Sequence, residues 1–345
     1  MALSPRAVRS PLHASAIGTA GQIARADFYI WNDPASIPTT PTLTASKPIL
    51  NTSDLRAWFD TSDFCRDYIN HTTFVPSVAN TVVPVGEYCY ATIKTYLDDV
   101  LHSSTVDLIC FDGYGYFLEG HNLSMSPVLM DAGTYLVSDE GDVGSIAIVD
   151  DATATWTVKY KPLNADFPEY TETLTQTVGQ VPYVDLNLRG TGGNRVSVLK
   201  NGVEQKAFTF TEVCEPKYEV YLCDFVNKFG AWQRLTFFKV SKEDFSTTSN
   251  EYKVMPQTLP YSTSENRTQV FNVNGKESIK VNTGWVDESF SEVIKQLMLS
   301  ETVRLNDLPV NITSKSSPMK KGINDKNINY EVSFMYSYDT INNVQ

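Results

Sequence analysis

Histidine is scarce in this 345-residue sequence, and its placement argues against zinc enzymes. No histidine lies within four residues of another, so HExxH and HxH patterns are absent. The four histidines are His13, His71, His102 and His121. His121, which follows Glu119 and Gly120, is the best single candidate for an acid or base; an ordinary loop histidine is the competing interpretation.

Cysteine is also scarce. The five cysteines are Cys65, Cys89, Cys110, Cys214 and Cys223. Their number is odd and no pair has CxxC spacing, which argues against a zinc site or a disulfide framework. The sequence therefore predicts reduced, mostly buried thiols.

Long apolar runs are missing as well. No stretch of 18 apolar residues occurs, so we expect no membrane span, and Met1–Ser10 lacks the apolar core of a secretory signal. The net charge of −12 disfavours nucleic-acid binding by the whole surface. Four lysines near the C-terminus form a local basic patch that we interpret as a solvated loop. They are Lys315, Lys320, Lys321 and Lys326.

What the sequence does contain favours a β-rich protein. Hydrophobic residues make up 42% and aromatic residues 12%, and Thr, Val and Tyr are plentiful. Such side chains suit a half-buried pleated surface. The predicted fold is mainly β, with β-sandwich domains and one packed helix. We expect an extended N-terminal arm over 1–25, one or two sandwiches over 26–213 with a possible division near 125, and a C-terminal sandwich over 214–345.

Turn-forming residues predict where the hairpins lie. Asn201-Gly202 lies between two β-rich runs, and this pair favours a turn that needs positive φ at both positions. Residues 227–230 and the pair Asn274-Gly275 predict two further hairpins in the C-terminal domain. The stretch from Ser241 to Gln269 is long and polar, more than a simple connection needs.

An amphipathic helix is predicted over 287–299. Its apolar residues recur at helical spacing, and Ser289 with Glu292 has the spacing of a capping box. The apolar positions are Phe290, Val293, Ile294, Leu297 and Met298. The closing strand, from Ile328 to Tyr338, alternates apolar and polar residues, so one of its faces should be buried.

Nothing else in the sequence indicates a reaction centre. The glycine-rich segment Arg189–Arg195 precedes a strand, whereas a phosphate loop opens a helix, so we interpret it as a hairpin loop. The acidic pairs in Asp139–Asp142 and at Asp150-Asp151 lack calcium-loop spacing and favour solvated turns. We therefore predict no enzyme, no catalytic residue, no metal and no cofactor.

The C-terminal third resembles structural proteins of tailed bacteriophages, especially those of Bacteroidetes-infecting and marine phages. The segments that carry the resemblance are Tyr218–Leu222, Val226–Trp232, Leu235–Phe238, Phe271–Glu277, Asn282–Trp285, Glu292–Glu301 and Gly322–Tyr338. Weaker similarity lies in Phe64–Ile69 and Phe111–Phe117. These phage proteins have N-terminal parts similar to fibronectin-type sandwiches. The order of strands, one helix and further strands in the C-terminal third of this sequence is also similar to tail-tube, distal-tail and baseplate-hub modules.

The resemblance implies a virion protein, made in the bacterial host cytoplasm, that forms an oligomeric ring or tube of the tail or neck. Its partners would be copies of itself and other virion proteins, without specific nucleic-acid binding. No catalytic positions come with the resemblance. Two alternatives stay open. A tail-tip receptor- or carbohydrate-binding module predicts clustered exposed aromatics, and a tail-associated glycosidase predicts two carboxylates facing each other in a cleft.

Overall fold

The structure is a computed structural model of the chain, and strands dominate it. It describes residues 4–33, 35–51, 53–71, 81–82, 86–105, 107–137, 144–149, 154–174, 179–186, 188–213, 217–256, 258–316 and 328–342. The prediction of a mainly β fold with sandwich domains and a packed helix is confirmed. Neither α-helix in this part of the chain has the length and hydropathy needed to cross a membrane.

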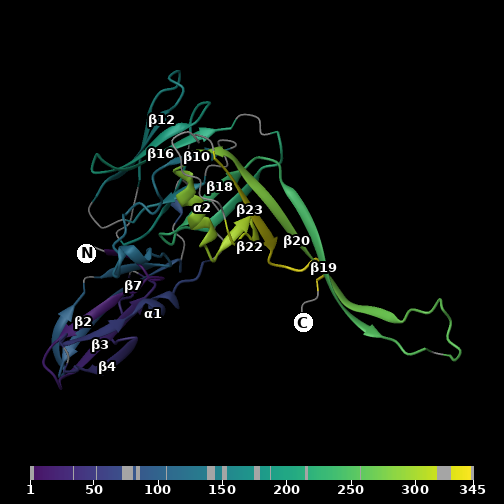
Figure 1. Ribbon diagram of the computed structural model, residues 1–345. Coiled ribbons are helices and arrows are strands. Elements are labelled where there is room, and N and C mark those ends of the chain that lie inside the picture. The colour runs from purple at the N-terminus through teal and green to yellow at the C-terminus, as the bar shows by residue number, and fades with distance from the viewer. Residues whose placement is uncertain are drawn as a thin grey trace.

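The N-terminal unit is a sandwich of a six-stranded sheet and a two-stranded sheet (Figure 1). The large sheet has the order β1-β9-β7-β3-β4, with β8 on β7, and β2 pairs with β5. A short helix, α1 (Ser62–Arg66), packs against β7 and β9. The strands are β1 (Ser4–Ala7), β2 (His13–Ile17), β3 (Ile23–Trp31), β4 (Leu43–Pro48), β5 (Arg56–Asp60), β7 (Tyr88–Leu97), β8 (Val100–Ser104) and β9 (Leu108–Phe111).

The predicted N-terminal arm over 1–25 is wrong where the structure describes it. β1 pairs in parallel with β9, β2 pairs with β5, and β3 already begins at Ile23. Ala7, Val8 and Leu12 are buried. The segment is short of large apolar residues, but its alanines fill a tightly packed core, which is why composition suggested an unpacked arm.

The middle of the chain forms two smaller sheets. The five-stranded sheet has the order β10-β16-β15-β12-β13, and the three-stranded sheet has the order β11-β14-β6. The strands are β6 (Thr81–Val82), β10 (Thr134–Val137), β11 (Ser145–Ala147), β12 (Trp156–Pro162), β13 (Tyr170–Thr173), β14 (Tyr183–Asp185), β15 (Asn194–Lys200) and β16 (Val203–Glu212). The β15–β16 hairpin confirms the Asn201-Gly202 turn, whose residues have φ of 50° and 80°.

The C-terminal part is a seven-stranded sheet of order β18-β17-β21-β22-β23-β20-β19. The strands are β17 (Tyr221–Val226), β18 (Trp232–Phe237), β19 (Lys242–Lys253), β20 (Thr268–Val286), β21 (Val303–Leu305), β22 (Leu308–Ile312) and β23 (Ile328–Tyr336). The β17–β18 pairing confirms the hairpin at 227–230. β23 buries alternate residues, as predicted.

The predicted helix is α2 (Phe290–Met298), which packs its apolar stripe into the core. That core is shared by the five-stranded and seven-stranded sheets, so the two sheets face one another across α2 and form one packed body. The capping-box prediction is wrong: Ser289 makes no side-chain cap bond, and Glu292 instead accepts a hydrogen bond from the Tyr116 hydroxyl. Tyr116 comes from the segment around the 3-10 turn η1 (Phe117–Glu119), which no local pattern could have placed there.

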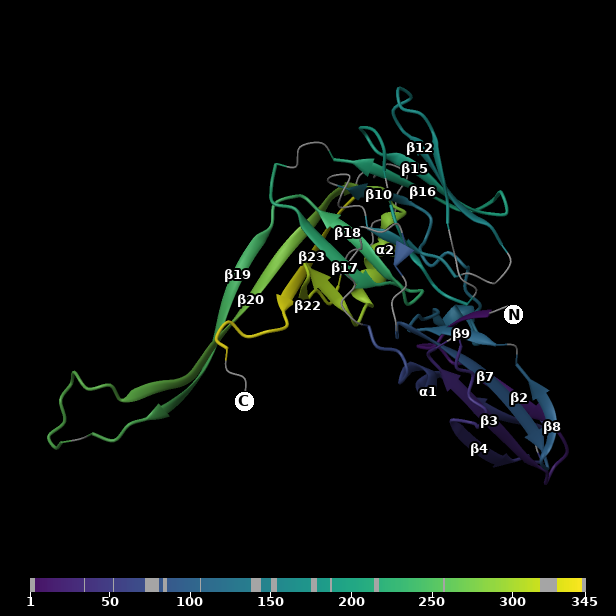
Figure 2. The same ribbon diagram turned by 180° about the vertical axis from the view of Figure 1, so that it is seen from behind.

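A further apolar cluster joins the N-terminal sandwich to this body. It combines residues of β3, β7 and β9 with the β17–β18 turn and β14, and its buried aromatic members are Trp31, Tyr88, Tyr90, Phe111, Tyr183 and Trp232. The chain is therefore a folded body from which one element stands apart, as the views from both sides show (Figures 1 and 2).

Candidate functional site

A long β-hairpin, here called the arm, leaves the body and extends into solvent (Figures 1 and 2). We define it as residues 242–280, in which β19 pairs antiparallel with the first part of β20 from Lys242–Lys280 to Lys253–Thr268. The sequence indicated only a long polar connection here. Alternation of apolar and polar residues is weak in β19 because all of its residues are exposed, and β20 becomes buried only toward the body, where Ile279 enters the core.

The arm lacks the cover that an isolated ribbon needs. All twelve residues of β19 are exposed. A two-stranded ribbon alone in water is marginally stable, because it buries little apolar surface. We therefore expect the arm to be stabilised by packing against another surface.

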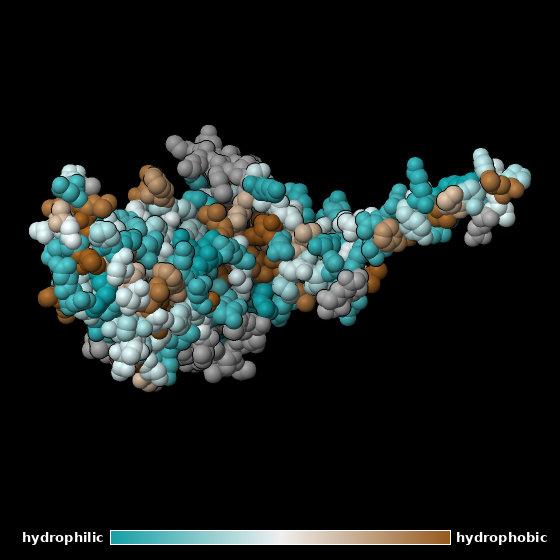
Figure 3. All heavy atoms as spheres, turned by 90° about the horizontal axis from the view of Figure 1, so that it is seen from below, coloured by the Kyte–Doolittle hydropathy of each residue, from teal (hydrophilic) through white to brown (hydrophobic). Residues whose placement is uncertain are grey.

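Apolar side chains occur along the whole arm (Figure 3). Met255 and Leu259, near the tip, are 85% and 84% exposed. Tyr252 and Phe271 pack edge to face across the two strands, with ring centroids 5.6 Å apart. The other exposed apolar residues of the arm are Phe245, Tyr261, Val270 and Val273.

The outer arm is electrically neutral, whereas the whole chain carries −12. Between residues 246 and 274 the charged residues are two acids, Glu251 and Glu265, and two bases, Lys253 and Arg267. A neutral ribbon can approach an acidic surface without the repulsion that two acidic bodies would meet. This charge pattern permits contact with another copy of the chain.

The predicted turn at Asn274-Gly275 is wrong, because both residues lie inside the continuous strand β20. Asn274 pairs with Thr248, and Gly275 pairs with Thr247. The ring of Phe245 covers Gly275, where an added Cβ would lie 2.3 Å from the ring carbon Cζ. The glycine makes room for a cross-strand aromatic ring, a role that its Asn-Gly context does not reveal.

An open groove lies where the arm joins the body. It has a volume of about 510 Å³, and its lining includes Tyr218, Val240, Lys280, Trp285 and Glu331. Trp285 is 64% exposed. The Lys280 ammonium and the Glu331 carboxylate form an ion pair within the lining. The groove offers one large aromatic face beside charged groups, an arrangement suited to stacking and hydrogen bonding.

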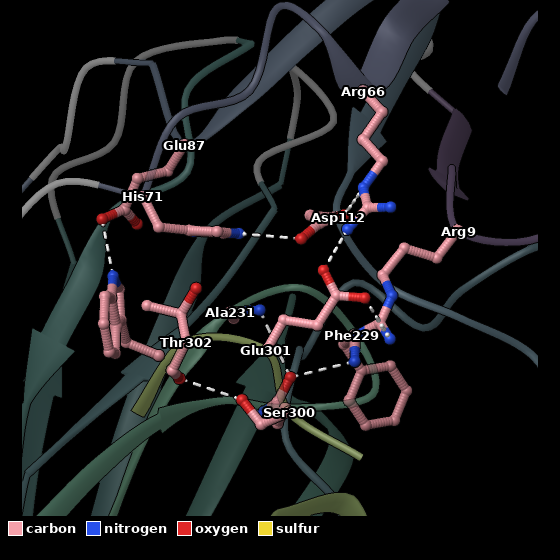
Figure 4. A network of polar contacts seen from close by, with 12 residues as sticks. Arg9, Arg66, His71, Glu87, Asp112, Phe229, Ala231, Ser300, Glu301 and Thr302 are labelled. Atoms are coloured by element: carbon pink, nitrogen blue, oxygen red, sulfur yellow. Dashed lines mark hydrogen bonds and ion pairs between the residues drawn. The ribbon is translucent and has the colours of Figure 1, made fainter. Parts of the chain in front are cut away.

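A polar network ties the N-terminal sandwich to the C-terminal sheet (Figure 4). The Arg66 guanidinium contacts Asp112 at 2.9 Å from Nε and also pairs with Glu301. Arg9 reaches the other oxygen of Glu301 at 3.0 Å. His71 Nε2 lies 3.3 Å from the second oxygen of Asp112. Both carboxylates are engaged by cations, so this network joins domains and leaves neither acid free for substrate chemistry.

A buried carboxyl stands next to this network. Glu87 accepts hydrogen bonds from the Trp232 indole at 2.7 Å and from the Tyr183 hydroxyl at 3.0 Å. Burial raises the pKa of Glu87, while these two hydrogen bonds oppose the rise. The three side chains come from β14, β18 and the residue preceding β7, so the contact fastens all three parts of the chain.

The structure brings the predicted candidate His121 close to His13 and Trp58. Its ring lies 5.5 Å from the His13 ring and 6.1 Å from Trp58, measured between centroids. His121 is exposed. His13 in turn lies 3.6 Å from an oxygen of Asp60. Sequence spacing could not show this grouping, because β2, β5 and the η1 loop meet only in the folded chain.

The glycines of the Arg189–Arg195 segment precede β15, which begins at Asn194, but they do not form the predicted hairpin loop, because β14 and β15 belong to different sheets. The amide of Gly192 donates to the Glu212 carboxylate at 2.8 Å, and Arg189 stacks over the Tyr170 ring. The loop thus holds a carboxylate of its own chain where a phosphate site would need free donors. The acidic turns at Asp139–Asp142 and Asp150-Asp151 lie outside the described residues, as do Lys320, Lys321 and Lys326; Lys315 is exposed.

Comparisons with known proteins leave the family open. No family model matches the chain, and no curated protein matches it. Among solved structures, extracellular domains 3–5 of Drosophila OTK align with 81% of this chain and 89% of that one, at 8% identity and a TM-score of 0.20. The FN1–FN3 domains of chicken CNTN1 align with 81% and 93%, at 8% identity and a TM-score of 0.18. Scores this low carry no functional argument.

Proposed function

We propose that this chain is a bacteriophage virion structural protein, an oligomeric ring or tube component of the tail or neck that assembles through subunit–subunit contacts. The observation that carries the assembly role is the arm: a projecting ribbon with an exposed twelve-residue strand and exposed apolar side chains. The assignment to a phage particle rests on the sequence resemblance of the C-terminal third.

The arm supports self-association over binding of an unrelated partner for two reasons. Its outer part has no net charge, so it can lie against a second acidic body. Ring-forming contacts between identical subunits are heterologous, with one surface of each copy meeting a different surface of the next. A single projecting element on a compact body suits that geometry, since each copy both gives and receives one arm.

The test measures oligomeric state by size-exclusion chromatography with light scattering over a range of concentrations. The full chain is compared with a variant in which residues 248–274 are replaced by Asn-Gly, which joins the paired residues Thr247 and Gly275 by a tight turn. We expect closed oligomers or polymers for the full chain and a folded monomer for the variant. A full chain that stays monomeric at high concentration would overturn the assembly proposal.

The virion assignment has its own test. Peptides of this chain should be found by mass spectrometry in intact, purified phage particles from a culture carrying the gene. Detection in the lysate but not in the particles would overturn the assignment.

A second candidate function, binding of a receptor or carbohydrate at a tail tip, is favoured by the groove beside Trp285. An exposed indole face next to ionic groups can stack on a sugar ring. Oligosaccharides from the host surface should then quench the fluorescence of the full chain, and Trp285→Ala should abolish binding without changing the circular dichroism spectrum. Equal quenching of the variant would exclude this groove.

A further inference from the structure

Three of the five cysteines converge at one point inside the N-terminal sandwich. Cys65 comes from α1, Cys89 from β7 and Cys110 from β9. Their sulfur atoms all lie within 4.8 Å of one another, and all three side chains are fully buried. Cys89 and Cys110 are direct partners in the antiparallel pairing of β7 with β9, and α1 places Cys65 over that pair.

The geometry is close to that of a metal site with three sulfur ligands. With metal–sulfur bonds of about 2.3 Å, three sulfurs in a plane around one ion lie about 4.0 Å apart. The sulfurs here are already within 4.8 Å of one another, so shifts of a few tenths of an ångström at each would close the site. The ligands also come from three separate segments, which is how a structural metal fastens a fold.

The ligand set selects the kind of ion. Thiolates favour soft ions, whereas calcium and magnesium need oxygen ligands. Within the part of the chain that the structure describes, no His, Asp or Glu joins the three sulfurs at this distance. Structural zinc is almost always four-coordinate, so a set of three sulfur ligands fits Cu(I) better.

We propose that Cys65, Cys89 and Cys110 bind one soft metal ion, Cu(I), in the core of the N-terminal sandwich. The site lies inside an apolar cluster that includes Phe28, Phe59 and Leu108. Each thiolate–copper bond that forms displaces one thiol proton to solvent, and the copper keeps its oxidation state. The bound ion would tie α1 to both strands and stabilise the fold.

The site is independent of the proposed assembly role. The three ligands lie in the N-terminal sandwich, whereas the arm belongs to the C-terminal sheet. Sequence spacing gave no sign of the site, because none of the three cysteines lies near another in the sequence. The signal that could have found it is the pairing of Cys89 with Cys110, which becomes visible only once the strand register is known.

The test titrates the full chain, reduced and free of metal, with Cu(I) supplied as its acetonitrile complex under anaerobic conditions. We expect one equivalent to bind, with a sulfur-to-copper absorption band in the near ultraviolet and three sulfur neighbours in X-ray absorption. Cys65→Ala, Cys89→Ala and Cys110→Ala should each lose stoichiometric binding. Cys223→Ala is the matched control, because Cys223 is equally buried but belongs to the other core.

Folding of each variant is checked by circular dichroism, and Cys89→Val provides a second variant should Cys89→Ala unfold. The unfolding temperature of the full chain should rise with one equivalent of Cu(I), while that of the folded Cys89 variant should stay the same. Three results would overturn the proposal: copper binding that survives loss of any one of the three cysteines, a disulfide between two of them in the chain as purified, or preferential binding of Zn(II) with a fourth ligand.

Discussion

Gly113 and Gly230 bring two backbone segments into direct contact at the junction between the N-terminal sandwich and the β17–β18 turn. A Cβ added to Gly230 would lie 2.7 Å from the amide nitrogen of Gly113, and one added to Gly113 would lie 2.6 Å from the carbonyl oxygen of Lys228. The amide of Tyr114 donates a 2.8 Å hydrogen bond to that same oxygen. The domains are therefore joined backbone to backbone, with no space for a side chain between them.

Gly113→Ala should destabilise this junction. The new methyl group would meet backbone atoms, which cannot move aside as a flexible side chain can, so we expect a loss of about 1–3 kcal/mol in the free energy of unfolding. Urea denaturation followed by tryptophan fluorescence measures it, because Trp232 lies in the junction cluster. Gly133→Ala is the control, since its Cβ would meet only the Tyr135 ring at 3.8 Å. Equal stabilities of the two variants would show that the backbone around Gly113 has room for a side chain.

The hairpins show what could be predicted from the sequence and why. Asn201-Gly202 was located correctly because two adjacent residues with positive φ dictate the turn. Asn274-Gly275 has the same letters, yet it lies in β20 because pairing with β19 and the Phe245 ring decide its conformation. Local chemistry predicts a turn only where no long-range partner competes for the same backbone.

Partners that are distant in the sequence account for the other errors. β1 was predicted as part of an arm because its partner β9 lies about a hundred residues further along the chain. The Arg66–Asp112–Glu301 network and the three-cysteine cluster likewise combine segments that have no common sequence pattern. By contrast, the apolar stripe of α2 and the alternation of β23 are periodic within one element, and both were predicted.

Leu259→Glu at the tip of the arm should weaken self-association without changing the stability of the isolated chain. Leu259 is 84% exposed, so a charge there costs the monomer little, but it would be buried uncompensated in a contact between copies. Light scattering should show a shift toward monomer. Val100→Glu is the matched control, because Val100 is 70% exposed on β8 of the body. The arm would lose its assigned role if both variants dissociated alike.

Arg66→Ala should loosen the attachment of the N-terminal sandwich. It removes one of two partners from each of Asp112 and Glu301, which keep His71 and Arg9, and Asp112 is largely buried. We expect a loss of about 1–2 kcal/mol, less than for a fully buried pair because Arg66 is partly exposed to solvent. Arg56→Ala, which breaks the exposed pair with Asp54, should cost about 0.5 kcal/mol or less. Thermal unfolding of both variants measures the two losses in stability. A larger loss for Arg56→Ala than for Arg66→Ala would contradict the prediction.

Asp185 should give the stability of the body a measurable pH dependence. The residue lies in β14 opposite Ser145, and its Oδ1 is buried without a hydrogen-bond partner among the residues that the structure describes. Burial raises the pKa of its carboxyl to about 6, and the charge of Arg234 opposes the rise. In the unfolded chain the pKa of an aspartate is about 3.9. The pKa of this carboxyl is higher in the folded chain than in the unfolded chain. Its contribution to the free energy of unfolding is therefore fully present below about pH 4 and is lost as the pH rises through about 6.

Asp185→Asn removes the ionisable group, so it should stabilise the chain at pH 8 and have little effect at pH 4. We expect a gain of about 1 kcal/mol at pH 8, reduced from the full value of the shift because the carboxyl is only partly buried. Urea midpoints of both proteins at the two pH values measure the difference. The same gain at both pH values would mean that the asparagine side chain stabilises the fold by a new hydrogen bond and not by removal of the charge. A loss at pH 8 would mean that attraction to Arg234 outweighs the cost of burying the charge.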